Sequence, residues 1–164
     1  PQVVMDDEAY FPFSGGNMPG NDHYYASSRG FAHGSLIYNR QAKFEEKLMV
    51  WLAISPAGLS KPYFCPSRMA VNAETYQNKC IRQRLIPFLH LHHQDGQYLF
   101  WPDLASSHYA ASTLSFLNHL EVKIVPKEMN PPNCPQLRPI EDFWGMLKQL
   151  VYANGWSAKS HEQF

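Results

Sequence analysis

The 164-residue sequence lacks the features that mark several large classes of protein. It has no run of about 18 apolar residues, so no membrane-spanning segment and no membrane partner are predicted. Its three cysteines, Cys65, Cys80 and Cys134, are odd in number and far apart. Their spacing argues against a disulfide scaffold and favours a reducing compartment. Lys and Arg together number 14, as do Asp and Glu, so the net charge does not point to a polyanionic partner.

The composition is that of a folded domain, with 45% apolar and 14% aromatic residues. A chain of this length can bury a core of its own, and we expect a single domain over 1–164. The charge is unevenly spread, because residues 31–94 carry eight basic and three acidic side chains. Such a basic middle fits a phosphate-binding face, and it also fits ordinary scatter.

Hydrophobic patterning predicts alternating strands and helices after an initial meander. We expect strands at 2–13, 47–54, 61–65, 96–101 and 122–125, and a long surface loop at 14–34. A helix should begin after Asn72 and be bent or stopped by Pro87, and two more should span 107–120 and 139–152. The order β-β-β-α-β-α-β-α predicts an α/β fold with one five-stranded mixed sheet and helices on both faces.

Three carboxylates fall where such a fold can gather them. Asp7 lies in or just after the first strand, Asp103 follows the strand at 96–101, and Glu141 lies in the first turn of the last helix. Ligands of α/β sheets bind outside the carboxyl ends of strands. Converging carboxylates repel each other unless a cation neutralises them, and Mg²⁺ or Mn²⁺ suits oxygen ligands. Acids at strand ends and in first helical turns are also common without any site.

Four sequence blocks resemble those of one enzyme family, in the same order and over nearly the whole chain. They are MDDEAYF at 5–11, VWLAISPAG at 50–58, FWPDLASSHYA at 100–110 and VPKEMNPPNCPQLRPIEDFWGMLK at 125–148. They are similar to the blocks around the catalytic acids of mariner-like DNA transposases. The 37 residues between Asp103 and Glu141 resemble the spacing of one branch of that family.

The resemblance implies a ribonuclease H-like fold and metal-dependent cutting and joining of DNA at transposon ends. Asp7, Asp103 and Glu141 match the three catalytic, metal-binding acids, and Asp6 is the rival for the first position. Two Mg²⁺ or Mn²⁺ ions are implied, one held by Asp7 and Asp103 and the other by Asp7 and Glu141. The first would activate water, and the second would stabilise the leaving 3′ oxygen. DNA is the implied partner, the nucleus the implied location, and a homodimer is compatible with the family.

The histidine of the third block has three open roles. His108 matches a family histidine that follows the second acid, and it could contact DNA, order the site or simply pack in the core. The chain also departs from the family, with Leu52, Leu104, Gln136 and Arg138 at positions where many members differ.

No helix-turn-helix region precedes the first strand, so we expect a catalytic domain that lacks this DNA-binding region. Residues upstream of Pro1 are expected to be missing. An alternative is a truncated or host-adopted remnant that binds DNA or protein without catalysis.

The sequence also contains partial signatures of two other kinds of site. His90, His92 and His93 form an H-x-H-H cluster, but no paired cysteines complete a zinc site. Ser106 and Ser107 stand beside His108 and near Asp103, but no G-x-S-x-G turn supports a hydrolase triad. No Gly-rich phosphate loop is present.

Overall fold

A mixed β-sheet forms the centre of the protein in the computed structural model, which describes residues 1–15, 45–65, 71–132 and 134–164. Its long strands are β1 (Gln2–Pro12) and β2 (Lys47–Ser55). The shorter strands are β3 (Gly58–Leu59), β4 (Tyr63–Cys65) and β5 (Tyr98–Trp101). The order is β3-β2-β1-β5, and β4 pairs with another stretch of β2.

The first strand lies between an antiparallel and a parallel neighbour. β1 pairs antiparallel with β2 from Met5 opposite Ile54 to Pro12 opposite Lys47. It pairs parallel with β5, and the last pair of that ladder is Met5 with Trp101. The carboxyl ends of β1 and β5 therefore point the same way, as the predicted site requires.

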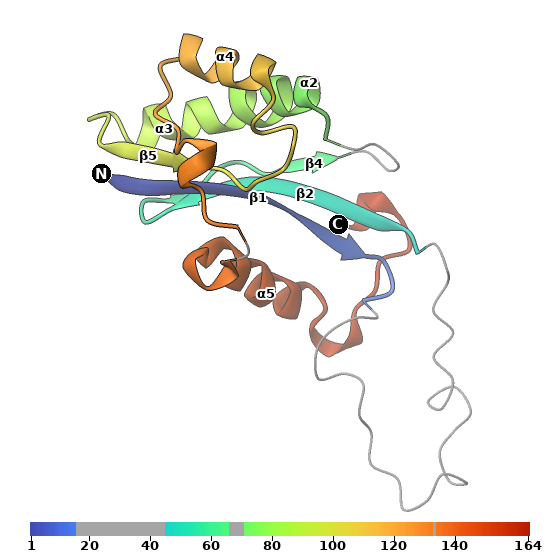
Figure 1. Ribbon diagram of the computed structural model, residues 1–164. Coiled ribbons are helices and arrows are strands. Elements are labelled where there is room, and N and C mark those ends of the chain that lie inside the picture. Colours follow the sequence, from blue (N-terminus) through green and yellow to red (C-terminus); the bar gives the residue numbers. More distant parts are fainter. Residues whose placement is uncertain (16–44, 66–70, 133) are drawn as a thin grey trace, which may run out of the picture.

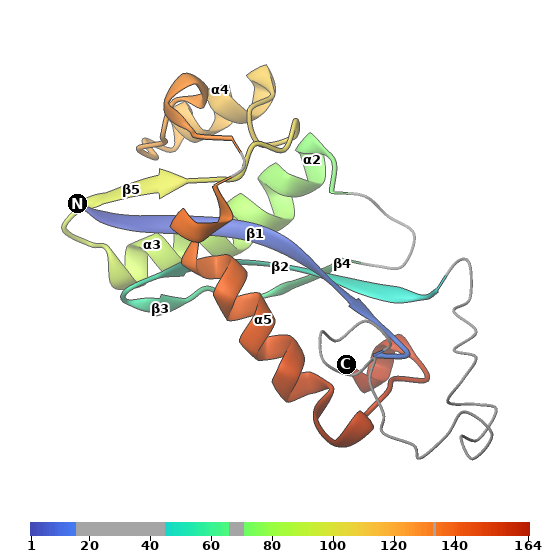
Figure 2. The ribbon, with the colours of Figure 1, turned by 60° about the horizontal axis from the view of Figure 1, so that its bottom comes forward.

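Helices cover both faces of the sheet, which confirms the predicted α/β class. The helical stretch α2 (Ala73–Thr75), η2 (Tyr76–Leu85) and α3 (Ile86–His92) lies on one face with α4 (Ala111–His119). The opposite face carries α5 (Pro139–Val151), as Figures 1 and 2 show. No described helix combines the length and apolar character needed to cross a bilayer.

Each face of the sheet has its own apolar core, because strand side chains alternate between the two faces. Trp51, Phe100 and Leu117 belong to the core under α4 and the long helical stretch. Phe11 and Trp144 belong to the core under α5. The short helices η5 (Ala153–Gly155) and η6 (His161–Gln163) follow α5, and the final residues reach this second core.

The helical stretch begins as predicted but does not end at Pro87. Asn72 caps it, since its side-chain oxygen accepts a hydrogen bond of 2.8 Å from the Thr75 N–H. From Tyr76 the stretch has the wider π-helical hydrogen bonding, and it changes to α-helix at Ile86. Pro87 lies directly after the change from π-helical to α-helical hydrogen bonding, and the helix is continuous through it. Of the two outcomes expected at Pro87, the stop is wrong, because the helix continues to His92.

Two further boundaries differ from the prediction. The segment 122–125 is no full strand, because only Ile124 forms a bridge with Phe100 and the Val122 N–H bonds to Leu117 at the end of α4. The helix expected from 107 starts at Ala111, since a turn precedes it. Residues 16–34 of the expected surface loop lie outside the described residues.

The connection from α4 to α5 contains two short helices. These are η3 (Lys127–Met129) and η4 (Pro135–Leu137). They bring the chain to Arg138, which directly precedes α5.

Candidate active site

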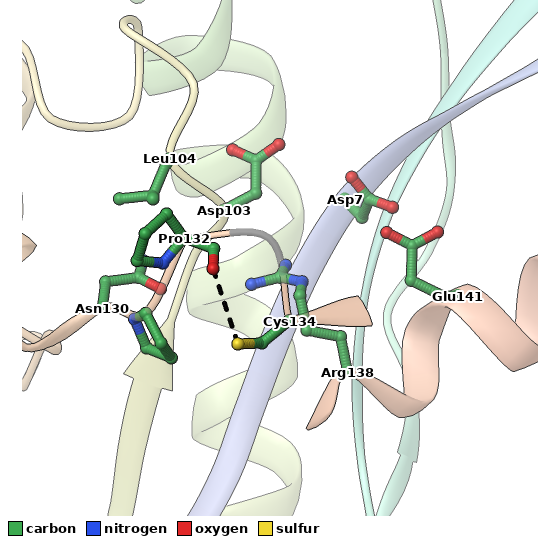
Figure 3. Close-up of a pocket in the computed structure, with 9 residues that line it drawn as sticks. Asp7, Asp103, Leu104, Asn130, Pro132, Cys134, Arg138 and Glu141 are labelled. Atoms are coloured by element: carbon green, nitrogen blue, oxygen red, sulfur yellow. Dashed lines mark hydrogen bonds between the residues drawn. The ribbon is translucent and has the colours of Figure 1, made fainter. Parts of the chain in front are cut away.

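Three acidic side chains from distant segments line one cavity, beside the middle of β1 and just past the carboxyl end of β5. Asp7 comes from β1, Asp103 follows β5, and Glu141 lies in the first turn of α5. The cavity has a volume of about 350 Å³, and in Figure 3 Asp7 lies between the other two carboxylates. The remaining lining residues are Leu104, Asn130, Pro131, Pro132, Cys134 and Arg138.

The parallel pairing of β1 with β5 explains why two of these acids meet. The ladder ends at Met5 and Trp101, and each strand reaches an aspartate two residues later. Asp7, which lies within β1, and Asp103, which follows β5, are therefore at the same level along the sheet. Helix α5 starts beside this edge, and Glu141, half a turn into the helix, is exposed at the cavity rim.

Asp7 is partly buried and carries a pKa shift caused by its surroundings. Burial raises its pKa to about 7, and the negative charges of Glu141 and Asp103 add to the rise. The indole N–H of Trp144 on α5 donates a hydrogen bond of 3.1 Å to Asp7 Oδ2. Ionising Asp7 is therefore unfavourable without a cation, first because the carboxylate is buried and second because two other acids lie near it.

Asp103 has the opposite shift. Burial by itself would raise its pKa, but the hydrogen bond and charge of His108 outweigh burial and hold the pKa below its usual range. Asp103 Oδ1 also accepts a hydrogen bond of 2.9 Å from the Ala105 N–H. This carboxylate is therefore ionised and fixed in orientation.

His108 is fully buried and has carboxylates on both ring nitrogens. Nδ1 forms an ion pair with Asp103, and Nε2 lies 3.3 Å from Glu8 Oε1. The ring stacks on Tyr76 with centroids 3.9 Å apart. Burial by itself would lower the His108 pKa, but the charge of Asp6 and the bonds to Asp103 and Glu8 raise it to about 10.

His108 is packed in the core of the structure, with its ring nitrogens beside Asp103 and Glu8. With no exposed surface, the side chain offers nothing for DNA to contact in this structure.

Asp6, the rival for the first acid, points to the opposite face of the sheet from Asp7. Its Oδ2 accepts hydrogen bonds of 2.9 Å from the Trp51 indole and 2.6 Å from the Tyr76 hydroxyl. Asp6 is completely buried, and burial raises its pKa to about 6. Asp7 lines the cavity and Asp6 does not.

Sequence reasoning missed a second acid-rich group beside the cavity. Glu8, Asp103 and His108 offer ligand atoms that all lie within 4.8 Å of one another. Strand alternation could have indicated it, because Glu8 is two residues from Asp6 and faces the same side of the sheet. Trp144 belongs to the core under α5 and also donates a hydrogen bond to Asp7, which the sequence did not indicate.

The two other hypothetical sites do not assemble. His93 is buried and its Nε2 lies 2.9 Å from Ser55 Oγ, whereas His90 and His92 are exposed on α3. Among the residues that the structure describes, these three histidines form no metal-binding group.

A serine hydrolase triad fails for a different reason. A triad histidine needs one ring nitrogen for the serine hydroxyl. Both nitrogens of His108 already face carboxylates, so neither is left for Ser106 or Ser107.

Comparison with known sequences gives one clear similarity. No protein-family model matches the chain. The Tc3 transposase of a transposable element from Caenorhabditis elegans is 28% identical over 152 residues, which cover 93% of this chain and 43% of that protein. The chain therefore spans less than half the length of this curated relative.

Comparison with solved structures shows the fold. The Mos1 mariner paired-end complex with Mn matches with a TM-score of 0.77 and 21% identity, covering 98% of this chain and 45% of that one. The catalytic domain of the Mos1 mariner transposase matches with a TM-score of 0.65 and 20% identity, covering 98% and 64%. The order of strands and helices described above is thus shared with that domain.

Proposed function

We propose that the chain is a mariner-like transposase catalytic domain that cuts DNA at transposon ends and joins the freed ends to target DNA. Its similarity to the Tc3 transposase and its fold support this proposal. The proposal assigns the catalysis to Asp7, Asp103 and Glu141, working with divalent metal ions. The convergence of these three carboxylates in one cavity is the observation that carries it.

The donor set fits Mg²⁺ or Mn²⁺. All three side chains supply hard oxygen ligands. Among the described residues, the ligand atoms that lie within 4.8 Å of one another are those of Glu8, Asp103 and His108, so Asp7, Asp103 and Glu141 line the cavity at a wider spacing. The pKa of Asp7 is raised first by burial and then by the charges of Glu141 and Asp103, and a bound cation would favour the ionised form against both. Solved Mos1 structures that contain Mn or Mg agree with this choice of metal.

The position of each acid suggests its role. Asp7 lies between the other two and is the natural ligand to share between two ions. Asp103 is held ionised by His108. Glu141 supplies the third carboxylate from the first turn of α5. A pair of bound ions supplies an activated water and charge stabilisation at the leaving 3′ oxygen of a phosphodiester.

The partners belong to the same proposal. Mos1 structures described as paired-end complexes with a transposon end support DNA as the partner. A homodimer and a nuclear location stay predictions.

Nicking of a supercoiled plasmid tests the proposal. We expect Mg²⁺- or Mn²⁺-dependent nicking by the wild-type chain and a loss of about 100-fold or more in Asp7→Asn, Asp103→Asn and Glu141→Gln, as for other essential electrostatic groups. Asp142→Asn is the matched control, because Asp142 is the next, exposed acid on α5 and does not line the cavity. Wild-type nicking by Asp103→Asn would contradict the assignment.

A non-catalytic remnant that only binds DNA or protein is not favoured. The three acids remain in one cavity, and nothing in the described residues fills it. A binding-only protein predicts no stabilisation by Mn²⁺, whereas a working site gains stability on binding.

A further inference from the structure

We propose that Arg138 is a positioning residue that holds the backbone of all three acids in register for metal binding. The inference rests on the proposed function and deepens it. Arg138 lies at the junction between η4 and α5 and lines the same cavity as Asp7, Asp103 and Glu141. Figure 3 shows its side chain beside the three carboxylates.

The guanidinium forms hydrogen bonds to both of the neighbouring segments that carry the aspartates. Nη2 donates a hydrogen bond of 2.8 Å to the carbonyl of Asp6, and Nη1 donates one of 3.3 Å to the carbonyl of Pro102. Asp6 and Pro102 are the residues directly before Asp7 and Asp103. The planar fork of an arginine is suited to holding two acceptors at once.

The sheet itself does not make this connection. The β1–β5 ladder ends at Met5 and Trp101, one residue short of the two carbonyls. On the other side of β1, Ala53 lies opposite Asp6 but donates its N–H to Ser60 Oγ. Arg138 therefore supplies the donor that the Asp6 carbonyl does not receive from Ala53 or from the ladder with β5.

The third acid is tied to the same residue through the backbone. The Glu141 N–H donates a hydrogen bond of 3.0 Å to the carbonyl of Arg138. The main chain of Arg138 thus contacts Glu141, and its side chain contacts the residues directly before Asp7 and Asp103. Only the side-chain contacts are lost when Arg138 is replaced. A displacement of Arg138 would change the spacing between Asp7 and the other two.

The carbonyls of Asp6 and Pro102 depend on the Arg138 side chain to different extents. The Pro102 carbonyl also accepts a hydrogen bond of 2.9 Å from Asn130 Nδ2, so it keeps a donor when Arg138 is removed. The Asp6 carbonyl loses its bond to the guanidinium outright. We therefore expect Asp7, rather than Asp103, to move.

Positioning and simple charge make opposite predictions. A guanidinium beside three acids opposes a metal cation, so removing it should tighten metal binding if its charge alone mattered. If Arg138 positions the acids, its removal should weaken metal binding, as loss of residues that orient metal ligands does by about 10- to 100-fold. A role confined to DNA contact predicts no change in metal affinity.

Titration of the 164-residue chain with Mn²⁺ alone, following the free ion by electron paramagnetic resonance, separates these cases. We expect the Mn²⁺ Kd of Arg138→Ala to rise at least about 10-fold. Arg138→Lys keeps the charge but loses the fork, so its Kd should also rise, by a smaller factor. Arg82→Ala, which removes an exposed arginine of η2, should bind as the wild type does.

The metal-free melting temperature shows whether each variant is folded, and Arg138→Lys carries the test if Arg138→Ala does not fold. Unchanged or tighter Mn²⁺ binding by a folded Arg138 variant overturns the positioning role. An absence of Mn²⁺ binding by the wild-type chain overturns the proposed function, and this inference with it.

Discussion

At the scale of single residues, buried charge is concentrated around His108. The imidazolium lies between Asp103 and Glu8, is stacked on Tyr76 and has no exposed surface. Tyr76 in turn donates its hydroxyl hydrogen to Asp6. Because a buried charge is tolerated only when it is paired, these residues depend on one another.

Replacement of His108 by alanine should therefore be costly. The change removes the cation between two carboxylates and leaves a cavity beside Tyr76, and we expect a loss of about 3 kcal/mol in the free energy of unfolding. Urea denaturation measures it. His119→Ala is the control, since His119 is exposed at the end of α4, and a loss in His108→Ala no larger than in this control would contradict the pairing.

The hydrogen bond from Trp144 to Asp7 gives a second prediction at this scale. Trp144→Phe keeps most of the apolar volume against Phe11 but removes the N–H donor to Asp7. We expect a loss of about 1.5–3 kcal/mol in the free energy of unfolding at a pH where Asp7 is ionised, the range for a hydrogen bond to a charged group. Trp156→Phe, at a partly exposed ring, serves as the comparison. Equal losses in the two variants would show that the Asp7 bond contributes nothing.

At the scale of elements, strands and helices with a clear pattern were predictable. The β-branched and aromatic run of β1, the continuous apolar run of β2 and the periodic stripe of α5 all form where the sequence indicates. The segment 122–125 has the composition of a strand, but a hydrogen bond from Val122 to the end of α4 leaves only one bridge. Such competition between tertiary partners is not visible in local sequence.

The start of the long helical stretch provides a prediction for an element. Asn72→Ala removes the side-chain acceptor of the Thr75 N–H, and we expect a loss of about 1 kcal/mol in the free energy of unfolding. Asn78→Ala changes an exposed asparagine inside η2 and should be neutral or slightly stabilising, since alanine favours helix. An unaffected Asn72→Ala variant in urea denaturation would show that the cap is not needed.

At the scale of the whole molecule, the site depends on three segments that meet only in the folded protein. The resemblance of short sequence blocks pointed to Asp7, Asp103 and Glu141, and the parallel β1–β5 pair explains how the first two meet. Arg138 and Glu8 could not be assigned roles from sequence. Their partners lie up to 132 residues away and are defined by backbone carbonyls and by side-chain direction.

Anomalous diffraction at the manganese edge, from crystals of the chain grown with Mn²⁺, tests the central claim most directly. The account predicts manganese peaks within coordination distance of the carboxylate oxygens of Asp7, Asp103 and Glu141, and their loss in Asp7→Asn. Manganese bound only by Glu8, Asp103 and His108, or no manganese at all, would contradict it.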